Sequence, residues 1–256
     1  MSKLSKLVLL VLASCIFFSF SAFALTGDSF SWYCKRNSEH RQPQIDPEMR
    51  FIEEHNGYYV DRKYADNKEK AIYLTFDAGY ENGNIEKILN ILKQENVPAS
   101  FFVLENLIKK NGELICRMVE EGHLVCNHTA THKDISDLSY DKLKNELEAL
   151  ESQFKEKTGR EMPKYFRPPE GRFSLNSIKN LEALGYKTVF WSFAYADWDN
   201  NNQMPYEKAI EKVMSNIHNG AIMLLHPTSS TNAEILPEVI KQLKDQGYKF
   251  KTVNEL

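Results

Sequence analysis

The feature that most constrains the fold is an alternation, from residue 71 to the carboxyl end, of short apolar runs and helical patterns. The first run, AIYLTF at 71–76, is rich in β-branched and aromatic residues, as buried strands are, and a helical apolar pattern follows it. Repeated strand–helix units build parallel sheets with right-handed crossovers. Similar runs begin at residues 99, 123, 164, 187, 221 and 248. About seven such units, with polar residues at successive strand ends, favour a deformed (β/α) barrel over an open doubly wound sheet.

Residues that can carry out chemistry follow five of these runs. They are Asp77, His128, His132, Arg167, Asp197 and His226. Each has a plain structural explanation, such as a helix cap for Asp77 or a core histidine at His226. The four-residue spacing of His128 and His132 suits a shared metal ion but is not specific alone. Because α/β folds place ligands at the carboxyl ends of parallel strands, their joint position there predicts one site.

Residues 1–24 read as an export signal. Lys3 and Lys6 precede an uncharged apolar run, and the small-residue sequence 22–24 (AFA) fits a signal-peptide cleavage site. Two other fates stay open: residues 12–15 (LASC) resemble a lipoprotein processing box, and the run is long enough for a membrane anchor of about 20 residues. Export is therefore predicted, and the mode of retention is left open.

The charge of the remaining chain argues against binding to nucleic acid. Without Lys3 and Lys6, the 32 basic residues fall to 30 against 35 acidic ones, a formal charge of −5. A phosphate backbone requires a basic surface. Cys34, Cys116 and Cys126 would remain after cleavage, an odd number that does not form a disulfide framework. Cys116 and Cys126 stand in apolar contexts and are predicted to be core residues.

The domain organisation follows from these patterns. Residues 25–69 mix aromatic residues with irregular stretches such as 41–48 (RQPQIDPE), so we expect an irregular N-terminal extension packed on the main domain. Residues 70–256 would form one catalytic domain, which is a usual size for a single core.

The motifs at the strand ends resemble those of a known family. In order they are TFDAG at 75–79, HTATH at 128–132, RPPEGRFS at 167–174, ADW at 196–198 and LLH at 224–226. This series is similar to the five ordered motifs of the polysaccharide deacetylases, the NodB-homology enzymes of carbohydrate esterase family 4. Five motifs in order are more specific than any one of them. Further stretches resemble the sporulation-linked peptidoglycan N-acetylmuramic acid deacetylases: 32–43, 80–83, 190–198 and 201–203.

The resemblance implies a role for each residue. Asp77 would be the general base that activates water, oriented by Arg167, and His226 the general acid. Asp197 would orient His226 and raise its pKa. A divalent metal would be held by His128 and His132 and would polarise the acetamide carbonyl. The residues implied to bind substrate are Tyr80, Pro168, Trp198 and Leu224.

One position departs from the family pattern. The family usually has a second aspartate, a metal ligand, directly after the first, and this chain has Ala78 there. Two protein ligands then remain where catalytic zinc usually has three. The resembled subgroup often carries asparagine at this position, so activity need not be lost. Zinc is the ion we expect, and its identity is left open by Ala78.

The implied function is hydrolytic N-deacetylation of N-acetylmuramic acid in peptidoglycan, which supplies the substrate for muramic-δ-lactam in the spore cortex. The partner would be peptidoglycan glycan strands, the protein a monomer, and contact with membrane limited to an uncleaved signal segment. Its place would be the cell wall or the space between the two membranes of a developing spore. Alternatives are a deacetylase of an N-acetylglucosamine polymer and a catalytically silent glycan-binding homologue. Retention of a base, an acid and their orienting partners argues against silence.

Overall fold

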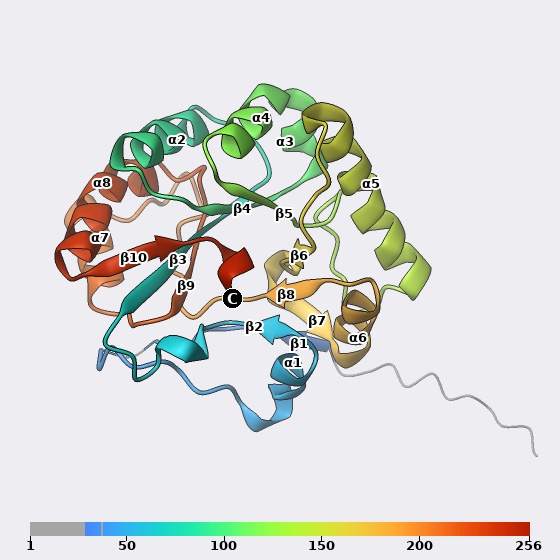
Figure 1. The fold of residues 1–256 in the computed structure, drawn as a ribbon, viewed down its shortest axis with the longest axis horizontal. Helices are drawn as coiled ribbons and strands as arrows, with labels where there is room; N and C mark the ends of the chain where they lie inside the picture. Colours follow the sequence, from blue (N-terminus) through green and yellow to red (C-terminus); the bar gives the residue numbers. More distant parts are fainter. Residues whose placement is uncertain (1–28, 37) are drawn as a thin grey trace, which may run out of the picture.

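A curled sheet of parallel strands forms the centre of the structure, and helices cover its outer face (Figure 1). This computed structural model describes residues 29–36 and 38–256, so the predicted signal segment lies outside the described residues. In this part of the chain the main sheet has eight strands: β2 (Gly57–Tyr58), β3 (Lys70–Ala78), β4 (Ser100–Val103), β5 (Leu124–Asn127), β6 (Tyr165–Phe166), β8 (Lys187–Val189), β9 (Ala221–Leu225) and β10 (Tyr248–Lys251). Seven of them come from the region predicted to form the barrel, which confirms the predicted fold class.

The helices follow the strands in the order that the alternation predicts. They are α1 (Phe51–Glu54), α2 (Asn84–Glu95), α3 (Glu105–Lys110), α4 (Gly112–Glu120), α5 (Tyr140–Thr158), α6 (Leu175–Ala183), α7 (Tyr206–Met214) and α8 (Ser230–Asp245). Short 3-10 turns lie at Pro47–Met49, Arg62–Tyr64, Pro169–Gly171 and Val253–Glu255. Helix α5 shows the local rules plainly: the Ser139 side chain accepts a hydrogen bond from Lys142 N, and Gly159 ends the helix at φ 70°. The described residues contain no helix with the length and apolar character needed to cross a membrane.

Strand β3 is the longest strand and holds the sheet together. It pairs in parallel with β10 and β4 and, over Ile72–Phe76, with β9. Successive side chains of a strand point to opposite faces. Tyr73 packs in the apolar cluster inside the barrel, whereas Phe76 and Ala78 belong to the cluster under the helices. Asp77 shares the parity of Tyr73, so it stands at the carboxyl end of β3 on the interior side.

The barrel is completed by a segment that leaves β8. The sequence predicts a strand over 187–191, but β8 ends at Val189. The chain then crosses to β9, where Leu224 N donates to Phe193 O at 2.8 Å and Phe193 bridges Met223 in parallel. These bonds bring the 190–194 segment to the mouth of the barrel.

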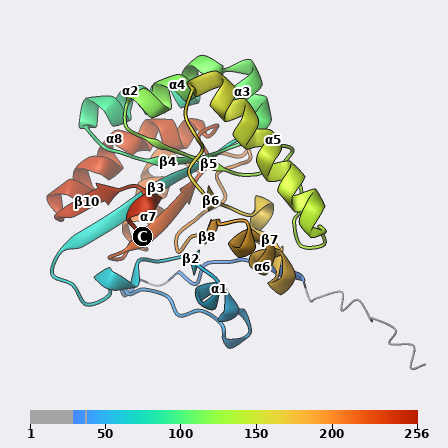
Figure 2. The same ribbon diagram turned by 45° about the vertical axis from the view of Figure 1, so that its right-hand side comes forward.

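The N-terminal extension lies against this same side of the barrel. Strand β1 (Ser29–Ser31) pairs antiparallel with β7 (Arg172–Ser174), and β2 pairs in parallel with β8. Figure 2 shows α1 next to α6, on the side of the molecule away from α2. The boundary between extension and catalytic domain at residue 69 stays a prediction. One prediction about the core is wrong: Cys116 is only partly buried, since it lies at the edge of α4 beside the carbonyl of Lys157 near the end of α5, whereas Cys126 is buried in the barrel.

Candidate active site

A pocket of about 640 Å³ opens at the carboxyl ends of the strands. Side chains from motifs far apart in the sequence meet in it, as the strand-end positions predict. The residues that line it are Asp77, Gly79, Tyr80, Leu104, His128, His132, Glu170, Trp191, Ala194, Tyr195, Trp198, Leu224, His226 and Thr228. Arg167 and Asp197 lie directly behind Asp77 and His226, respectively, as their hydrogen bonds show.

Asp77 and Arg167 form a buried ion pair. Arg167 Nη1 donates to Asp77 Oδ1 at 2.7 Å, and the fully buried guanidinium also donates to the carbonyls of Val189 and Phe190 at 3.0 and 3.3 Å. Burial alone would raise the pKa of Asp77, but the positive charge of Arg167 and the nearby His128 and His226 outweigh it, so the pKa is lowered. Asp77 is therefore an ionised carboxylate at neutral pH, with Oδ2 free of Arg167.

His128 and His132 lie beside this carboxylate. His128 Nδ1 is 2.7 Å from the carbonyl oxygen of Arg167, which accepts its hydrogen bond and leaves Nε2 without a proton, 3.6 Å from Asp77 Oδ2. The ring centroids of the two histidines are 5.1 Å apart. Burial lowers the pKa of His128 to about 4, against the opposing charge of Asp77, so its imidazole is neutral. Neutral imidazole is the form that binds metal.

The loop that carries the two histidines has an unusual backbone. Thr129 and His132 have φ values of 69° and 59°, in the left-handed region that non-glycine residues rarely adopt. Asn127 Oδ1 holds the turn by accepting from Thr129 N at 2.9 Å. Such strain persists only where the surroundings enforce it, and it is concentrated at functional sites.

His226 and Asp197 form the second pair, in which Asp197 is buried and His226 is partly exposed to the pocket. Asp197 Oδ1 is 2.7 Å from His226 Nδ1, and Oδ2 accepts from the backbone N–H of His226 at 2.8 Å and from Asn232 Nδ2 at 2.6 Å. Burial would lower the pKa of His226, but the hydrogen bond and charge of Asp197 outweigh it and raise the pKa. His226 therefore faces the pocket as an imidazole that readily holds a proton.

Comparison with known proteins agrees with this geometry. The model of a family described as polysaccharide deacetylase matches residues 64–189. The chain is 39% identical over 234 residues to peptidoglycan-N-acetylmuramic acid deacetylase PdaA of Bacillus subtilis, and the match covers 91% of this chain and 88% of PdaA. The chain belongs to the polysaccharide deacetylase family. The members of this family are metal-dependent hydrolases that act on acetamide bonds.

Solved structures of deacetylase relatives have the same fold. The structure of Bacillus subtilis PdaA, a family 4 carbohydrate esterase, aligns with a TM-score of 0.84 over 90% of this chain and 97% of that one. A family 4 pseudoenzyme from Bacillus anthracis, 30% identical, aligns with a TM-score of 0.70 over 78% of this chain and 68% of that one. A peptidoglycan-N-acetylglucosamine deacetylase of Bacillus cereus is 35% identical over 74% of this chain and 89% of its own length.

Deacetylases of this family use a divalent metal, and the donors near Asp77 are suited to one. His128 offers an unprotonated Nε2, and His132 lines the same pocket. In the described part of the chain no group of three or more His, Cys, Asp or Glu side chains forms a complete metal site. Ala78, at the position of the usual third ligand, is fully buried in the apolar cluster that also contains Ala130. The pair therefore fits an ion whose other ligands are water or substrate oxygens.

The four residues predicted to bind substrate lie at different depths, and three of them line the pocket. Leu224 is nearly buried at the base of the pocket, whereas Tyr80 and Trp198 are 46% and 61% exposed at its rim. Asn200 Nδ2 donates to the Tyr80 hydroxyl at 2.8 Å, which links two of the site loops. Pro168 is buried and is not among the residues that line the pocket. It lies before the turn at Pro169–Gly171, so it shapes the backbone beside Arg167.

Sequence reasoning missed several residues of the deacetylase pocket. Glu170 lines the pocket and has a φ of 55°. It is the charged residue that follows Pro169 in the RPPEGRFS motif, and this charge could have marked it as a site residue. Trp191 ends the predicted strand 187–191, so the rule that strand ends face the ligand applied to it as well. Asn232 lies in α8, and no local pattern shows that it would reach Asp197.

Proposed function

We propose that this protein removes the acetyl group of N-acetylmuramic acid in peptidoglycan by hydrolysis. One observation carries the proposal: a buried carboxylate–guanidinium pair and a partly buried imidazole–carboxylate pair face one pocket, in a chain that resembles PdaA over 91% of its length. A base and an acid on opposite sides of a bound acetamide are what its hydrolysis requires.

In this mechanism Asp77 takes a proton from the attacking water. Its low pKa, set by Arg167, keeps it ionised, and Oδ2 is the oxygen left free for the water. The carbonyls of Val189 and Phe190 hold the guanidinium and so keep the carboxylate aimed at the pocket. Loss of the base would reduce turnover more than glycan binding, because proton transfer occurs in the transition state.

His226 then gives its proton to the departing amine. Asp197 accepts from Nδ1, which leaves Nε2 as the nitrogen that faces the reaction, and its charge favours the protonated ring. Asn232 fixes Asp197 through Oδ2 and also donates to the carbonyl of His226 at 3.0 Å. The imidazole is thus held in one orientation before substrate arrives.

His128 and His132 would hold the divalent ion, for which we propose zinc. When bound, such an ion supplies Lewis-acid polarisation of the acetamide carbonyl. Leu224 would contact the acetyl methyl at the base of the pocket, and Tyr80 and Trp198 would pack against sugar rings at its rim, as exposed aromatic side chains can. The described residues offer no stretch of positive surface of the kind that nucleic acid needs at the pocket, whose lining includes Asp77 and Glu170.

The place of the reaction is part of the proposal. The signal-like residues 1–24 support export across the cytoplasmic membrane, to the cell wall or the space between the two membranes of a developing spore. The product, a muramic acid with a free amine, is the group that must close on its own lactyl side chain to form muramic-δ-lactam in spore cortex. This links the protein to sporulation and to the cortex that is broken down during germination.

Mass spectrometry of peptide-free glycan strands after incubation tests the proposal. The wild-type protein, loaded with Zn²⁺, should remove one acetyl group from muramic acid residues, and Asp77→Asn should lower the rate about 10²–10⁴-fold while still binding the strands. Acetate loss from glucosamine residues would favour the rival deacetylase. Glycan binding without any acetate release would favour a silent homologue, a fate that the Bacillus anthracis pseudoenzyme shows is open to this fold.

A further inference from the structure

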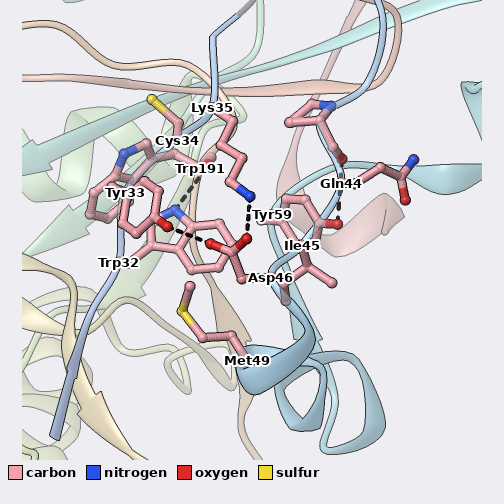
Figure 3. A pocket seen from close by; sticks show the side chains of 11 residues that line it. Trp32, Tyr33, Cys34, Lys35, Gln44, Ile45, Asp46, Met49, Tyr59 and Trp191 are labelled. Atoms are coloured by element: carbon pink, nitrogen blue, oxygen red, sulfur yellow. Dashed lines mark hydrogen bonds and ion pairs between the residues drawn. The ribbon is translucent and has the colours of Figure 1, made fainter.

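The N-terminal extension packs against residues that line the pocket. Trp32 N donates to Gly171 O at 2.8 Å, and Trp32 Nε1 donates to Trp191 O at 2.9 Å (Figure 3). Gly171 has no room for a side chain, since a Cβ there would lie 2.8 Å from the Trp191 ring and 3.0 Å from Trp32. Trp191 lines the catalytic pocket on its other side. The extension is therefore packed directly onto a wall of the active site.

The contacts between the extension and the pocket-lining residues continue from Trp32 to Arg36. Cys34 lies against the backbone of Ala194, and Arg36 Nη1 donates to Ala194 O at 3.2 Å. Ala194 itself lines the catalytic pocket. This contact places the exposed Arg36 guanidinium next to the mouth of the pocket, with its Nε and Nη2 donors not bonded to any described residue.

Two exposed cations lie beside lining residues of the pocket: Arg36, which contacts Ala194, and Lys133, which follows His132. Lys35, the residue before Arg36, pairs with Asp46, as Figure 3 shows. Among the described residues, no carboxylate lies within ion-pair distance of Arg36, and no lysine or arginine lines the pocket. Arg167, the other arginine that contacts a lining residue, is fully buried and bonded to Asp77. Within the part of the chain that the structure describes, Arg36 is thus an exposed cation bonded to the backbone of a lining residue, with no carboxylate at ion-pair distance.

The proposed substrate carries an anion near the reacting group. N-acetylmuramic acid differs from N-acetylglucosamine by a lactyl ether at C3, which ends in a carboxylate one ring carbon away from the acetamide. The pocket itself holds the acidic side chains of Asp77 and Glu170, which repel a second carboxylate. A substrate with this group therefore needs a cation at the rim, and a guanidinium can bind a carboxylate through two parallel hydrogen bonds.

We propose that Arg36 binds the lactyl carboxylate of N-acetylmuramic acid and is a specificity-determining residue of this enzyme. The inference rests on the proposed function, since it assigns one part of that substrate to one side chain. The inference also gives the extension a role in the enzyme. Trp32 anchors the extension to Gly171 and Trp191, and Arg36, four residues further along, would bind the substrate.

Paired substrates and paired variants test it. Acetate release by the zinc-loaded protein is measured on peptide-free glycan with its lactyl carboxyl intact, and on the same glycan with that carboxyl reduced to an alcohol. Arg36→Ala should raise KM about 10- to 100-fold on the first substrate, the range expected for a charge-assisted hydrogen bond, and leave kcat little changed. On the reduced glycan, wild type and Arg36→Ala should be equal.

Two control variants test whether the effect is specific to Arg36. Lys35→Ala removes the same charge from the neighbouring residue, which faces Asp46, and should behave as wild type. Lys133→Ala removes an exposed charge next to His132 and should also leave KM unchanged. The inference is overturned if Arg36→Ala is unchanged on both substrates, if it loses activity equally on both, or if Lys133→Ala shows the selective loss instead.

The same data separate this inference from the proposed function. If wild type releases acetate only from glucosamine residues, the proposed function fails. If wild type deacetylates muramic acid equally well with and without the lactyl carboxylate, the proposed function stands and only the role of Arg36 fails.

Discussion

His128 and His226 line the same pocket, the first buried and the second with 27% of its side chain exposed, and their surroundings shift their pKa values in opposite directions. Burial lowers the pKa of His128 to about 4. Burial also lowers the pKa of His226, but the hydrogen bond and charge of Asp197 outweigh it and the net shift is upward. The difference lies in what each Nδ1 contacts: the neutral carbonyl of Arg167 in one case and the carboxylate of Asp197 in the other.

The contrast shows that a second partner sets the chemical role of an imidazole. A carbonyl partner fixes the tautomer of His128 and leaves it neutral, which suits a metal ligand. A carboxylate partner adds charge stabilisation and keeps a proton on His226, which suits a general acid. Asp77 is near His128 as well, and its charge raises the pKa of His128, but the effect of burial is larger.

The largest effect is expected from removing the acid. His226→Ala should lower kcat about 10²–10⁴-fold, the usual contribution of a general acid–base group, while KM changes little. Steady-state acetate release measures it, with glycan binding as the control for folding. A variant that turns over like wild type would mean that another group protonates the leaving amine.

A smaller effect, visible in the pH profile, is expected from replacing Asp197, the carboxylate that bonds to His226. The acid must be protonated, so the rate falls as pH rises through the pKa of His226. Asp197→Asn keeps the shape of the side chain but removes its charge, so burial would then lower the pKa of His226 and move the alkaline limb of kcat to lower pH. Each unit of this shift costs about tenfold in rate above both pKa values. An alkaline limb at an unchanged pH would mean that Asp197 does not set the charge of His226.

Much of this arrangement was predictable from the sequence because parallel strands end at one edge. Asp77 and His128 follow apolar runs more than 40 residues apart, and their strands are neighbours of the common partner β4. The barrel class and the family resemblance are confirmed; the roles of the site residues remain predictions.

The rest depends on contacts that no local pattern reports. Asn232 reaches Asp197 only because α8 begins right after the turn that follows β9. Trp32 and Trp191 are 159 residues apart, and their bond depends on how the extension docks on β7. Pro168, predicted to touch substrate, is buried directly before a tight turn and does not line the pocket.

The smallest effect is expected at Ala78. His128 has no carboxylate bonded to its Nδ1, whereas His226 has Asp197. Ala78→Asp adds a carboxylate at the position where the family usually has a metal ligand. Since an anionic oxygen attracts a divalent cation directly, Zn²⁺ affinity should rise at least about tenfold, which is about 1.4 kcal/mol. Activity is expected to stay equal or fall: the added negative charge weakens the ion as a Lewis acid and lies next to Asp77, whose pKa it raises.

Calorimetric titration of metal-free wild type, Ala78→Asp and Ala78→Asn measures this prediction. Without metal the new carboxylate is buried in an apolar cluster, so Ala78→Asp should melt below wild type and gain more from Zn²⁺. The asparagine variant has the same shape without the charge, and should bind Zn²⁺ more weakly than the aspartate variant. Equal affinity in wild type and Ala78→Asp would show that residue 78 keeps the orientation that strand alternation gives it, away from the two histidines. His128 and His132 would then be the whole protein contribution to the ion, and its release by chelators should be equally easy in both proteins.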